Sequence, residues 1–218
     1  MSHALIPVIE ERRAFAVIRT ATAQQAIEAG RACLRGGIRL LEITLTIPDA
    51  LSAIRALAAE REAIVGVGSV VAPAQVAEAA SAGASFAVSP HFDPDVLAAA
   101  ESRGMLSTMG GDTPTEAMTC HRAGVDVIKI FPASSFGGPA HLKAMLEPMP
   151  FLRLMPTGGV DLDNMRAYLD AGAAGFGLGG SLVDKKAVAA GDWPAIEKTA
   201  RGVVDAVAAW RDGRAARA

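Results

Sequence analysis

Two ionisable residues interrupt otherwise apolar stretches of this sequence, and their residue types suit covalent carbonyl chemistry. Glu42 lies within residues 40–45 and Lys129 lies within residues 125–131. Both stretches are typical of β-strands because β-branched and aliphatic residues dominate them. An amine that is removed from water favours its neutral form, which can attack a ketone to form a Schiff base, and a nearby carboxylate can pass the protons. Lys129 is therefore the candidate nucleophile and Glu42 the candidate acid/base, with a buried structural salt bridge as the alternative.

The side chains of a strand alternate between its two faces, so the pattern predicts which residues accompany Glu42 and Lys129. If these two side chains point inward, Leu41, Ile43 and Leu45 should point outward. The residues expected to share the two inward faces are Leu40 and Thr44 beside Glu42, and Val125, Val127 and Phe131 beside Lys129.

Arg19 brings a third ionisable group to the same region. It follows the apolar stretch 14–18 and lies on the face of Phe15 and Val17. A guanidinium can hold a carboxylate through two parallel hydrogen bonds. We therefore expect Arg19 to bind a substrate carboxylate, with a salt bridge at the rim as the alternative.

Glycine clusters mark three loops that follow apolar stretches. Two of them, Pro-Thr-Gly-Gly-Val at 156–160 and Gly-Leu-Gly-Gly-Ser at 177–181, lie near the C-terminus. Backbone N–H groups in such loops bind phosphate, so we predict a phosphate site there, with tight turns as the alternative. The residues assigned to this site are Gly158, Gly159, Gly179, Gly180 and Ser181. The third cluster, Gly-Val-Gly-Ser at 66–69, would let a substrate approach the backbone, although a tight turn explains it equally well.

Eight short apolar stretches position these residues, and longer amphipathic segments alternate with them, as in β-α-β units. The expected strands are 14–18, 40–45, 63–67, 86–89, 105–108, 125–131, 152–155 and 175–178. From Ala14 to Gly175 their spacing averages 161/7, about 23 residues, which accommodates one strand, one helix and two loops. The pattern predicts an α/β fold, a (β/α)8 TIM barrel that occupies 1–218 as one domain after a short N-terminal helix. An open doubly wound sheet is the alternative, but its usual glycine-rich first turn is missing at 19–22.

Helix boundaries are marked by proline or a capping residue at the first turn and by glycine after the last. The expected helices include 22–35, 50–60, 73–82, 94–102, 114–122 and 162–171. In a barrel of this kind the C-terminal ends of the strands surround the active site. Glu42, Lys129, Arg19 and the glycine loops should therefore meet at one end of the molecule.

Composition excludes several classes of protein. Of 218 residues, 51% are hydrophobic and 20% are charged, which excludes a disordered chain. The net charge of −2 favours neither nucleic acid nor a membrane surface as a partner, and no apolar run approaches a membrane span of about 20 residues. Because Cys33 and Cys120 form no CxxC pair and no signal peptide is evident, we expect buried thiols and a cytoplasmic location.

Neither a metal nor another cofactor is expected. The histidines are scattered over different segments without metal-ligand spacing, at positions 3, 91, 121 and 141. His91 follows an expected strand, where it would be a polar residue that touches the substrate. The C-terminal Arg211, Arg214 and Arg217 are expected to form a frayed, solvated end.

Several motifs together resemble the 2-keto-3-deoxy-6-phosphogluconate (KDPG) aldolases, a family that includes enzymes acting on 4-hydroxy-2-oxoglutarate (KHG) and on 6-phosphogalactonate analogues. The motifs are Leu-Glu-Ile-Thr-Leu at 41–45, Gly-Val-Gly-Ser-Val at 66–70, Val-Ser-Pro at 88–90, Ile-Lys-Ile-Phe-Pro at 128–132 and Pro-Thr-Gly-Gly-Val at 156–160. The resemblance runs from about Arg13 to Val183. It implies a homotrimeric barrel without a metal, with Lys129 as the Schiff-base lysine and Glu42 as the acid/base.

This resemblance implies cleavage of a phosphorylated 2-keto-3-deoxy sugar acid to pyruvate and glyceraldehyde 3-phosphate. The residues then expected to contact the small-molecule substrate are Arg19, Thr44, Ser69, Pro90 and Phe131. Arg19 or Ser69 would hold the carboxylate, while Phe131 and Pro90 would form the walls.

Four departures from the family pattern concern the substrate. Thr46 stands where many members carry an arginine, and the strand end Thr-Met-Gly-Gly-Asp at 108–112 stands where relatives usually have a Pro-Gly pair. Residues 131–137 resemble the 6-phosphogalactonate branch, and either Gly180 or Ser181 could be the family's phosphate contact. The galactonate epimer and KHG therefore stay open as substrates.

Three more distant functions also stay open. A metal-dependent pyruvate aldolase would need clustered ligands, and a phosphosugar isomerase or epimerase would need no Schiff-base lysine. A phosphosugar-binding barrel without catalytic activity is the third.

Overall fold

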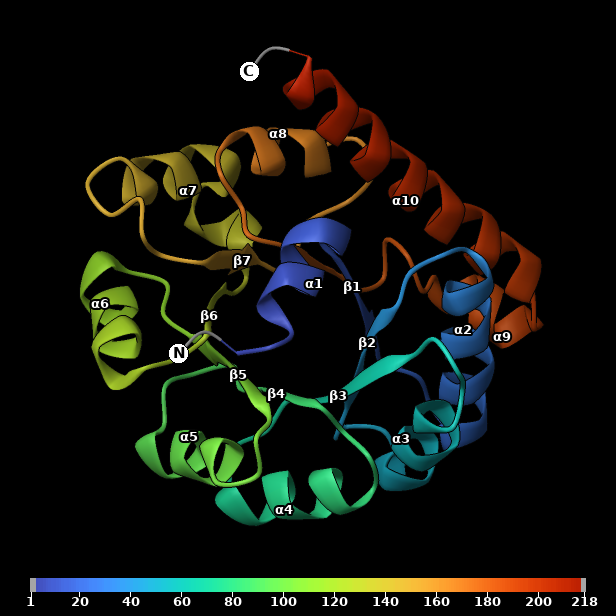
Figure 1. The fold of residues 1–218 in the computed structure, drawn as a ribbon. Helices are drawn as coiled ribbons and strands as arrows, with labels where there is room; N and C mark the ends of the chain where they lie inside the picture. The colour runs from blue at the N-terminus through green and yellow to red at the C-terminus, as the bar shows by residue number, and fades with distance from the viewer. Residues whose placement is uncertain (1–2, 217–218) are drawn as a thin grey trace.

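Eight parallel strands form a barrel at the centre of the molecule, and helices surround it (Figure 1). The computed structural model describes residues 3–216. The strands are β1 (Ala14–Ile18), β2 (Leu40–Thr44), β3 (Ile64–Gly68), β4 (Phe86–Val88), β5 (Leu106–Gly110), β6 (Val127–Ile130), β7 (Leu154–Pro156) and β8 (Phe176–Leu178). They pair in the order β7-β6-β5-β4-β3-β2-β1-β8, and a bridge between Thr157 and Gly177 joins the two edges. This topology confirms the predicted (β/α)8 barrel and excludes the open sheet.

Each strand is followed by helical structure, and a short helix precedes the first strand, as predicted. The helices are α1 (Ile6–Arg12), α2 (Ala23–Arg35), α3 (Ala50–Ala58), α4 (Pro73–Ser81), α5 (Pro94–Glu101), α6 (Pro114–Ala123), α7 (Gly138–Leu146), α8 (Met165–Asp170), α9 (Lys185–Ala190) and α10 (Trp193–Ala215), with a 3-10 turn η1 (Ala133–Phe136) before α7. The capping residues and prolines predicted from the sequence lie at the N-termini of several helices. For example, the Thr113 hydroxyl accepts the N–H of Glu116, whose carboxylate accepts the Thr113 N–H, so the two residues form a capping box.

Two apolar clusters lie on either side of the strands. Inside the barrel, Phe15 and Phe86 pack edge to face with ring centroids 5.6 Å apart. Beneath them, Ile6 and Ile9 of α1 close the N-terminal end of the barrel, where Figure 1 shows α1 across the centre. The inner cluster also contains Leu40, Val88, Leu106, Val127 and Met155.

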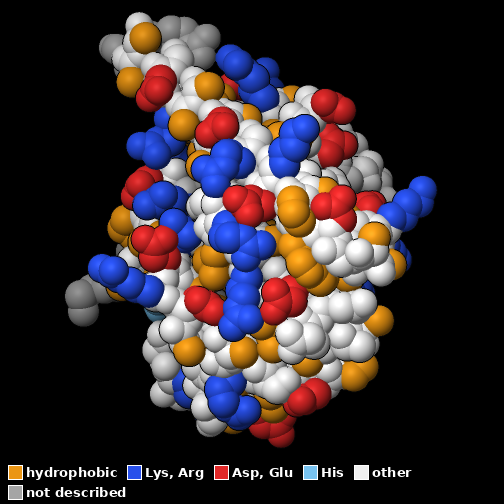
Figure 2. Space-filling model, turned by 90° about the vertical axis from the view of Figure 1, so that its right-hand side faces the viewer, with side chains coloured by type: hydrophobic (Ala, Val, Ile, Leu, Met, Phe, Trp, Pro, Cys, Tyr) orange, Lys and Arg blue, Asp and Glu red, His pale blue; other side chains and the backbone are white. Residues whose placement is uncertain are grey.

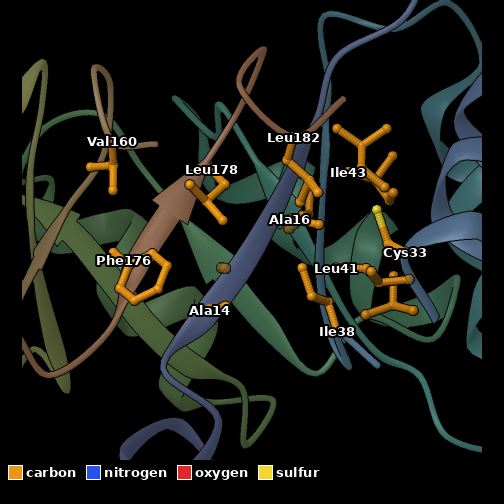
Figure 3. Packing of buried hydrophobic residues seen from close by; sticks show 14 of the residues in the cluster. Ala14, Ala16, Cys33, Ile38, Leu41, Ile43, Val160, Phe176, Leu178 and Leu182 are labelled. Atoms are coloured by element: carbon orange, nitrogen blue, oxygen red, sulfur yellow. The ribbon is translucent and has the colours of Figure 1, made fainter. Parts of the chain in front are cut away.

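The outer cluster joins the strands to the helices. Figure 3 shows Leu41 and Ile43 of β2 near Cys33 of α2. These positions confirm the predicted alternation in β2, because Leu40 packs in the inner cluster and Leu41 in the outer one. The prediction that Val125 shares the face of Lys129 is wrong. Val125 packs in the outer cluster, because β6 begins only at Val127.

Most other boundaries shift by one to three residues, and two differences near the C-terminus have a clear cause. Helix α8 begins at Met165 rather than at 162, because the Asp161 carboxylate accepts the N–H groups of Asp163 and Asn164 in a turn. Helix α10 continues to Ala215, so Arg211 and Arg214 are helical rather than frayed, while Arg217 lies outside the described residues. The buried Trp210 side chain holds this end of α10 against the barrel.

The side of the molecule formed by α2, α3, α9 and α10 carries basic and acidic side chains interspersed with one another (Figure 2). Arg35 of α2 lies 2.8 Å from Glu197 of α10, and Arg31 lies 2.9 Å from Glu60. Exposed pairs of this kind contribute little to stability. Among residues 3–216, no helix is both long and apolar enough to cross a membrane.

Candidate active site

Glu42 and Lys129 meet inside the barrel, although β2 and β6 are far apart in the sequence. The Lys129 Nζ lies 4.0 Å from the Glu42 Oε1, and the two residues are 5% and 1% exposed. Burial raises the pKa of Glu42, although the charges of Lys129 and Arg19 oppose this shift. The Glu42 Oε2 has no hydrogen-bond partner among the described residues. The pair therefore offers an amine beside a carboxyl group that can exchange protons.

Glycines in β3 make room for these inward side chains. A Cβ at Gly68 would lie 2.2 Å from the Glu42 Oε1, and a Cβ at Gly66 would lie 2.2 Å from the Phe86 ring. Neither glycine has a positive φ, and both belong to the strand. The turn geometry considered for residues 66–69 therefore does not account for Gly66 and Gly68, which are required by the side chains that face them.

Phe131 lies immediately after β6 and covers Lys129. Its ring centroid is 4.9 Å from the Lys129 Nζ, and its side chain is partly exposed at the mouth of the barrel. The Phe131 N–H donates to the Asp112 Oδ1 over 2.6 Å, which fixes the backbone at this point. Partial burial raises the pKa of Asp112. Sequence reasoning missed Asp112, whose position directly after a glycine pair at a strand end was the available signal.

Arg19 and Ser69 lie together at the mouth. The Arg19 Nη2 is 3.5 Å from the Ser69 Oγ, and the Ser69 backbone has a φ of +62°, an unusual conformation for a residue with a side chain. Thr44 is fully buried, and its hydroxyl donates to the Ile18 carbonyl and lies 2.9 Å from the Thr46 Oγ1. Arg19 and Ser69 are thus the polar groups with freedom to meet a ligand, while the Thr44 proton is engaged by the backbone.

The two C-terminal glycine loops form one wall of a hollow of about 380 Å³ at the mouth. Its lining includes all of the residues predicted to bind phosphate, together with Arg19 and Phe131. The Ser181 hydroxyl donates to the Val160 carbonyl over 2.7 Å and so ties the two loops together. Within the described part of the chain, the backbone N–H groups of Gly159, Gly180 and Ser181 have no acceptor. These unpaired donors give the hollow a preference for an anion.

Thr157 is a further polar group of this hollow that sequence reasoning missed. Its side-chain oxygen is buried without a partner among the described residues, and the same holds for Thr108 of β5. Thr157 lies beside Gly177, where a Cβ would come within 2.5 Å of the hydroxyl. The motif at 156–160 contains this threonine, but only its two glycines were assigned to the phosphate site.

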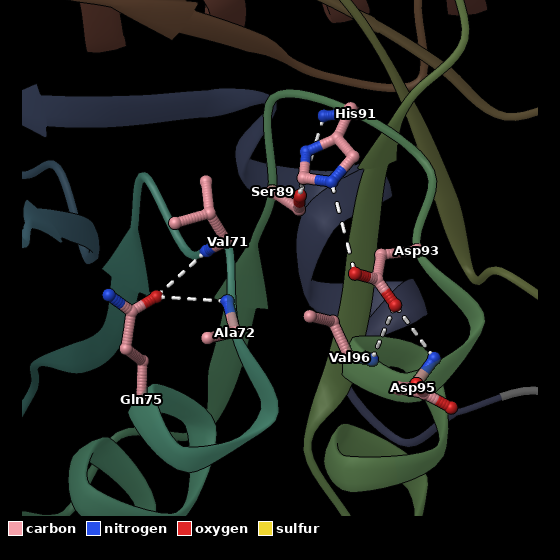
Figure 4. A network of polar contacts seen from close by, with 8 residues as sticks. All are labelled: Val71, Ala72, Gln75, Ser89, His91, Asp93, Asp95 and Val96. Atoms are coloured by element: carbon pink, nitrogen blue, oxygen red, sulfur yellow. Dashed lines mark hydrogen bonds and ion pairs between the residues drawn. The ribbon is translucent and has the colours of Figure 1, made fainter.

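Pro90 and His91 line a neighbouring hollow of about 350 Å³ with Gly110 and Asp112. Figure 4 shows His91 between Ser89 and Asp93: its Nδ1 lies 3.2 Å from the Ser89 Oγ, and its Nε2 lies 3.9 Å from the Asp93 Oδ2. Asp93 also caps α5 through the N–H groups of Asp95 and Val96. Pro90 is therefore close to the mouth, but it lines a different hollow from the glycine loops.

A hollow of about 550 Å³ lies at the opposite end of the barrel around Arg13 and Trp210. Arg13 donates to the carbonyls of Ala173 and Ala174, and its guanidinium carbon lies 5.5 Å from the centre of the Trp210 ring. These contacts attach α10 to the barrel. The hollow is remote from Lys129, so we place the reactive site at the smaller hollow.

Potential metal ligands do not cluster at either end. Within residues 3–216, no group of three or more His, Cys, Asp or Glu side chains is arranged to hold a metal ion. Cys33 and Cys120 are buried free thiols, and burial raises the pKa of Cys33 to about 12. Neither thiol is a reactive group at neutral pH.

Comparisons with known proteins agree with this geometry. Residues 5–199 match the family model described as KDPG and KHG aldolase. The KHG/KDPG aldolase of Escherichia coli K12 is 40% identical over 184 residues, which cover 84% of this chain and 86% of that protein.

Solved structures at 30% identity or more share the fold, and two of them are informative. The KDPG aldolase of Legionella pneumophila, with pyruvate captured at low pH as a covalent carbinolamine intermediate, has a TM-score of 0.84 and 30% identity, and the match covers 91% of this chain and 97% of that one. A structure described as native KDPGal has a TM-score of 0.83 and 32% identity, with 91% and 96% of the chains covered.

Proposed function

The chain belongs to the KDPG and KHG aldolase family, and from this premise we propose that it cleaves 2-keto-3-deoxy-6-phosphogluconate to pyruvate and glyceraldehyde 3-phosphate through a Schiff base on Lys129. One observation carries the proposal: the buried Lys129 Nζ lies 4.0 Å from the Glu42 Oε1, beneath a hollow with unpaired N–H donors. An amine, a proton carrier and an anion site are the three parts that this reaction needs.

The first half of the reaction joins the substrate to Lys129. The neutral amine attacks the C2 ketone, a bond forms between Nζ and C2 as the π bond of the ketone breaks, and Glu42 relays a proton from Nζ to the ketone oxygen to give a carbinolamine. Glu42 then delivers a second proton to that hydroxyl, which leaves as water and produces an iminium ion. The raised pKa of Glu42 supports this role, because the acid form persists to higher pH than that of an ordinary glutamate.

The second half breaks the bond between C3 and C4. Glu42, through a water molecule, removes the C4 hydroxyl proton, and the electron pair of the breaking bond moves into the iminium ion to give an enamine. Glyceraldehyde 3-phosphate leaves. The proton that Glu42 took up then adds to C3 of the enamine. Water hydrolyses the resulting iminium ion, which releases pyruvate, regenerates the Lys129 amine and returns a proton to Glu42.

The remaining residues position the substrate. Arg19 and Ser69 hold the carboxylate next to C2, and Thr44 supports them from beneath. Phe131 forms a wall of the mouth hollow, and Pro90 forms a wall of the neighbouring hollow. The glycines and Ser181 of the two C-terminal loops bind the phosphate through their N–H groups.

A second substrate is favoured by a specific observation. The native KDPGal structure is 32% identical to this chain, and residues 131–137 resemble that branch. We therefore propose the C4 epimer, 2-keto-3-deoxy-6-phosphogalactonate, as the second candidate, and KHG as the third.

The test is pyruvate release from these three substrates by the wild type and the Lys129→Met variant. We expect the gluconate compound to give the highest kcat/KM and the variant to lose at least about a thousandfold in kcat. A higher kcat/KM for the galactonate compound would transfer the assignment to the second candidate. Ligand-dependent thermal stabilisation without pyruvate release from any of the three would instead indicate a phosphosugar-binding barrel.

We further propose that residues 1–218 form a single domain, that the protein is a homotrimer and that it acts in the cytoplasm. The family resemblance supports the trimer, and the two buried free thiols support a reducing compartment. Neither a nucleic acid nor a membrane partner is proposed.

A further inference from the structure

A substrate of the proposed reaction carries negative charge at both ends, a carboxylate next to C2 and a phosphate at C6. Only two cationic side chains of the described residues line the hollow at the mouth, Arg19 and Lys185. We infer that Lys185 binds the phosphate and sets a preference for phosphorylated over unphosphorylated sugar acids, an inference that rests on the proposed function. Nothing in the sequence pattern singled out Lys185.

The backbone holds Lys185 next to the second phosphate loop. The N–H groups of Leu182 and Val183 both donate to the Gly179 carbonyl, over 3.0 and 2.9 Å, so the chain turns tightly after Gly180 and Ser181. Lys185 is then the first residue of α9. The unpaired N–H groups of Gly180 and Ser181 and the lysine therefore belong to one short segment with a fixed conformation.

The start of α9 is itself anchored. The Asp184 carboxylate accepts the N–H groups of Lys186 and Ala187, both over 2.9 Å, and Val183 and Val188 are buried. The Lys185 side chain lies between the mouth hollow and a second hollow of about 360 Å³, and Arg19, Val183 and Lys185 line both. An ammonium on a long, exposed side chain at this boundary can reach an anion in the mouth without crossing protein.

Arg19 is committed to the other end of the substrate. Its Nη2 lies 3.5 Å from the Ser69 Oγ, directly after β3, although Arg19 also lines the mouth hollow together with the glycine loops. If Arg19 holds the carboxylate there, the phosphate meets neutral N–H groups and a single cation, Lys185. This division of charge would also explain how the chain functions with Thr46 where many relatives carry an arginine.

One acidic side chain in the mouth hollow makes a cation more necessary. Asp161 lines the hollow, although its Oδ1 accepts the N–H groups of Asp163 and Asn164, both over 3.0 Å. Its negative charge opposes a phosphate dianion. Lys185 supplies the opposite charge from the facing loop.

The test compares two substrates that differ only in the phosphate, 2-keto-3-deoxy-6-phosphogluconate and 2-keto-3-deoxygluconate. For Lys185→Met we expect the ratio of their kcat/KM values to fall about tenfold, through a higher KM for the phosphorylated acid, since an exposed charge is partly screened by solvent. Lys185→Arg should restore most of the ratio. Lys186→Met is the matched control, because this neighbouring exposed lysine lines neither hollow, and its ratio should equal that of the wild type.

An unchanged ratio in Lys185→Met, or an equal fall in Lys186→Met, would overturn the inference. These outcomes leave the proposed function intact, because the wild type would still cleave the phosphorylated acid. If the wild type releases no pyruvate from either acid, the proposed function fails, and the inference fails with it.

Discussion

Glu42 can lie inside the barrel only because β3 carries glycine at the position that faces it. We expect Gly68→Ala to displace the Glu42 carboxylate from Lys129, since the added Cβ would lie 2.2 Å from the Glu42 Oε1. A displacement of the carboxylate by about 1 Å should lower kcat about a hundredfold. The overpacking caused by the added methyl group should lower the unfolding free energy by about 1 to 3 kcal/mol. Steady-state kinetics and urea denaturation measure the two effects.

The matched control is Gly202→Ala in α10, where a Cβ would meet only the Leu162 side chain at 3.7 Å. Alanine is a better helix former than glycine, so this variant should be as stable as the wild type or more stable. A wild-type kcat in Gly68→Ala would contradict the role given to Gly68.

The titration of Glu42 should also be visible in the stability of the protein. Burial raises its pKa. A carboxyl group with a raised pKa stabilises the fold fully below its pKa in the unfolded chain, about 4.3, and this contribution is lost as the pH rises through the folded pKa. Glu42→Gln does not titrate. The unfolding free energy of the wild type minus that of Glu42→Gln should therefore decline as the pH rises above about 4.

Urea denaturation at a series of pH values from acidic to mildly alkaline would measure this difference. A difference that stays constant, or that increases with pH, would mean that the pKa of Glu42 is not raised in the folded protein.

At the scale of strands and helices, alternation predicted the inward position of Glu42 correctly, because both of its neighbours in β2 are aliphatic. The same rule failed for Val125, since it depends on knowing where the strand begins. The donors of the glycine loops could be predicted from the sequence, but a single sequence does not show that Lys185 of α9 lines the same hollow, and Lys185 was missed for that reason. Contacts such as that between the Phe131 N–H and Asp112 depend on tertiary packing, which a single sequence does not specify.

Helix α10 was not predicted, and its attachment to the barrel is testable. Trp210 is 4% exposed, and its Nε1 donates to the Asp170 Oδ1 over 2.8 Å. We expect Trp210→Ala to lower the unfolding free energy by about 3 kcal/mol, because a large buried ring is replaced by a cavity. Its kcat should change little, since Trp210 lies at the end of the barrel opposite Lys129.

Arg166→Ala is a suitable control for Trp210→Ala, because Arg166 approaches the same Asp170 at 3.8 Å but is mostly exposed. The Arg166→Ala substitution should change the unfolding free energy by no more than about 0.5 kcal/mol. Equal losses in both variants would show that Asp170, and not the buried ring, holds the helix.

At the scale of the whole molecule, one end of the barrel is structural and the other carries the candidate site. The end closed by α1 supplies packing (Figure 1), whereas the other end gathers the ionisable side chains and the glycine loops.

The proposed trimer should be detectable in solution. Three chains of 22.4 kDa would sediment as one species of about 67 kDa in analytical ultracentrifugation. A species of 22.4 kDa at micromolar concentration would contradict the trimer without affecting the proposed chemistry.

The central claim is that Lys129 forms a Schiff base with a 2-keto acid. The most direct measurement is incubation with pyruvate and borohydride, followed by mass spectrometry of the digested protein. We predict one stable adduct per chain, on the peptide that contains Lys129, and none in Lys129→Met. Lys143, Lys185, Lys186 and Lys198 serve as internal controls in the same digest. No adduct, or an adduct on one of these other lysines, would contradict the claim.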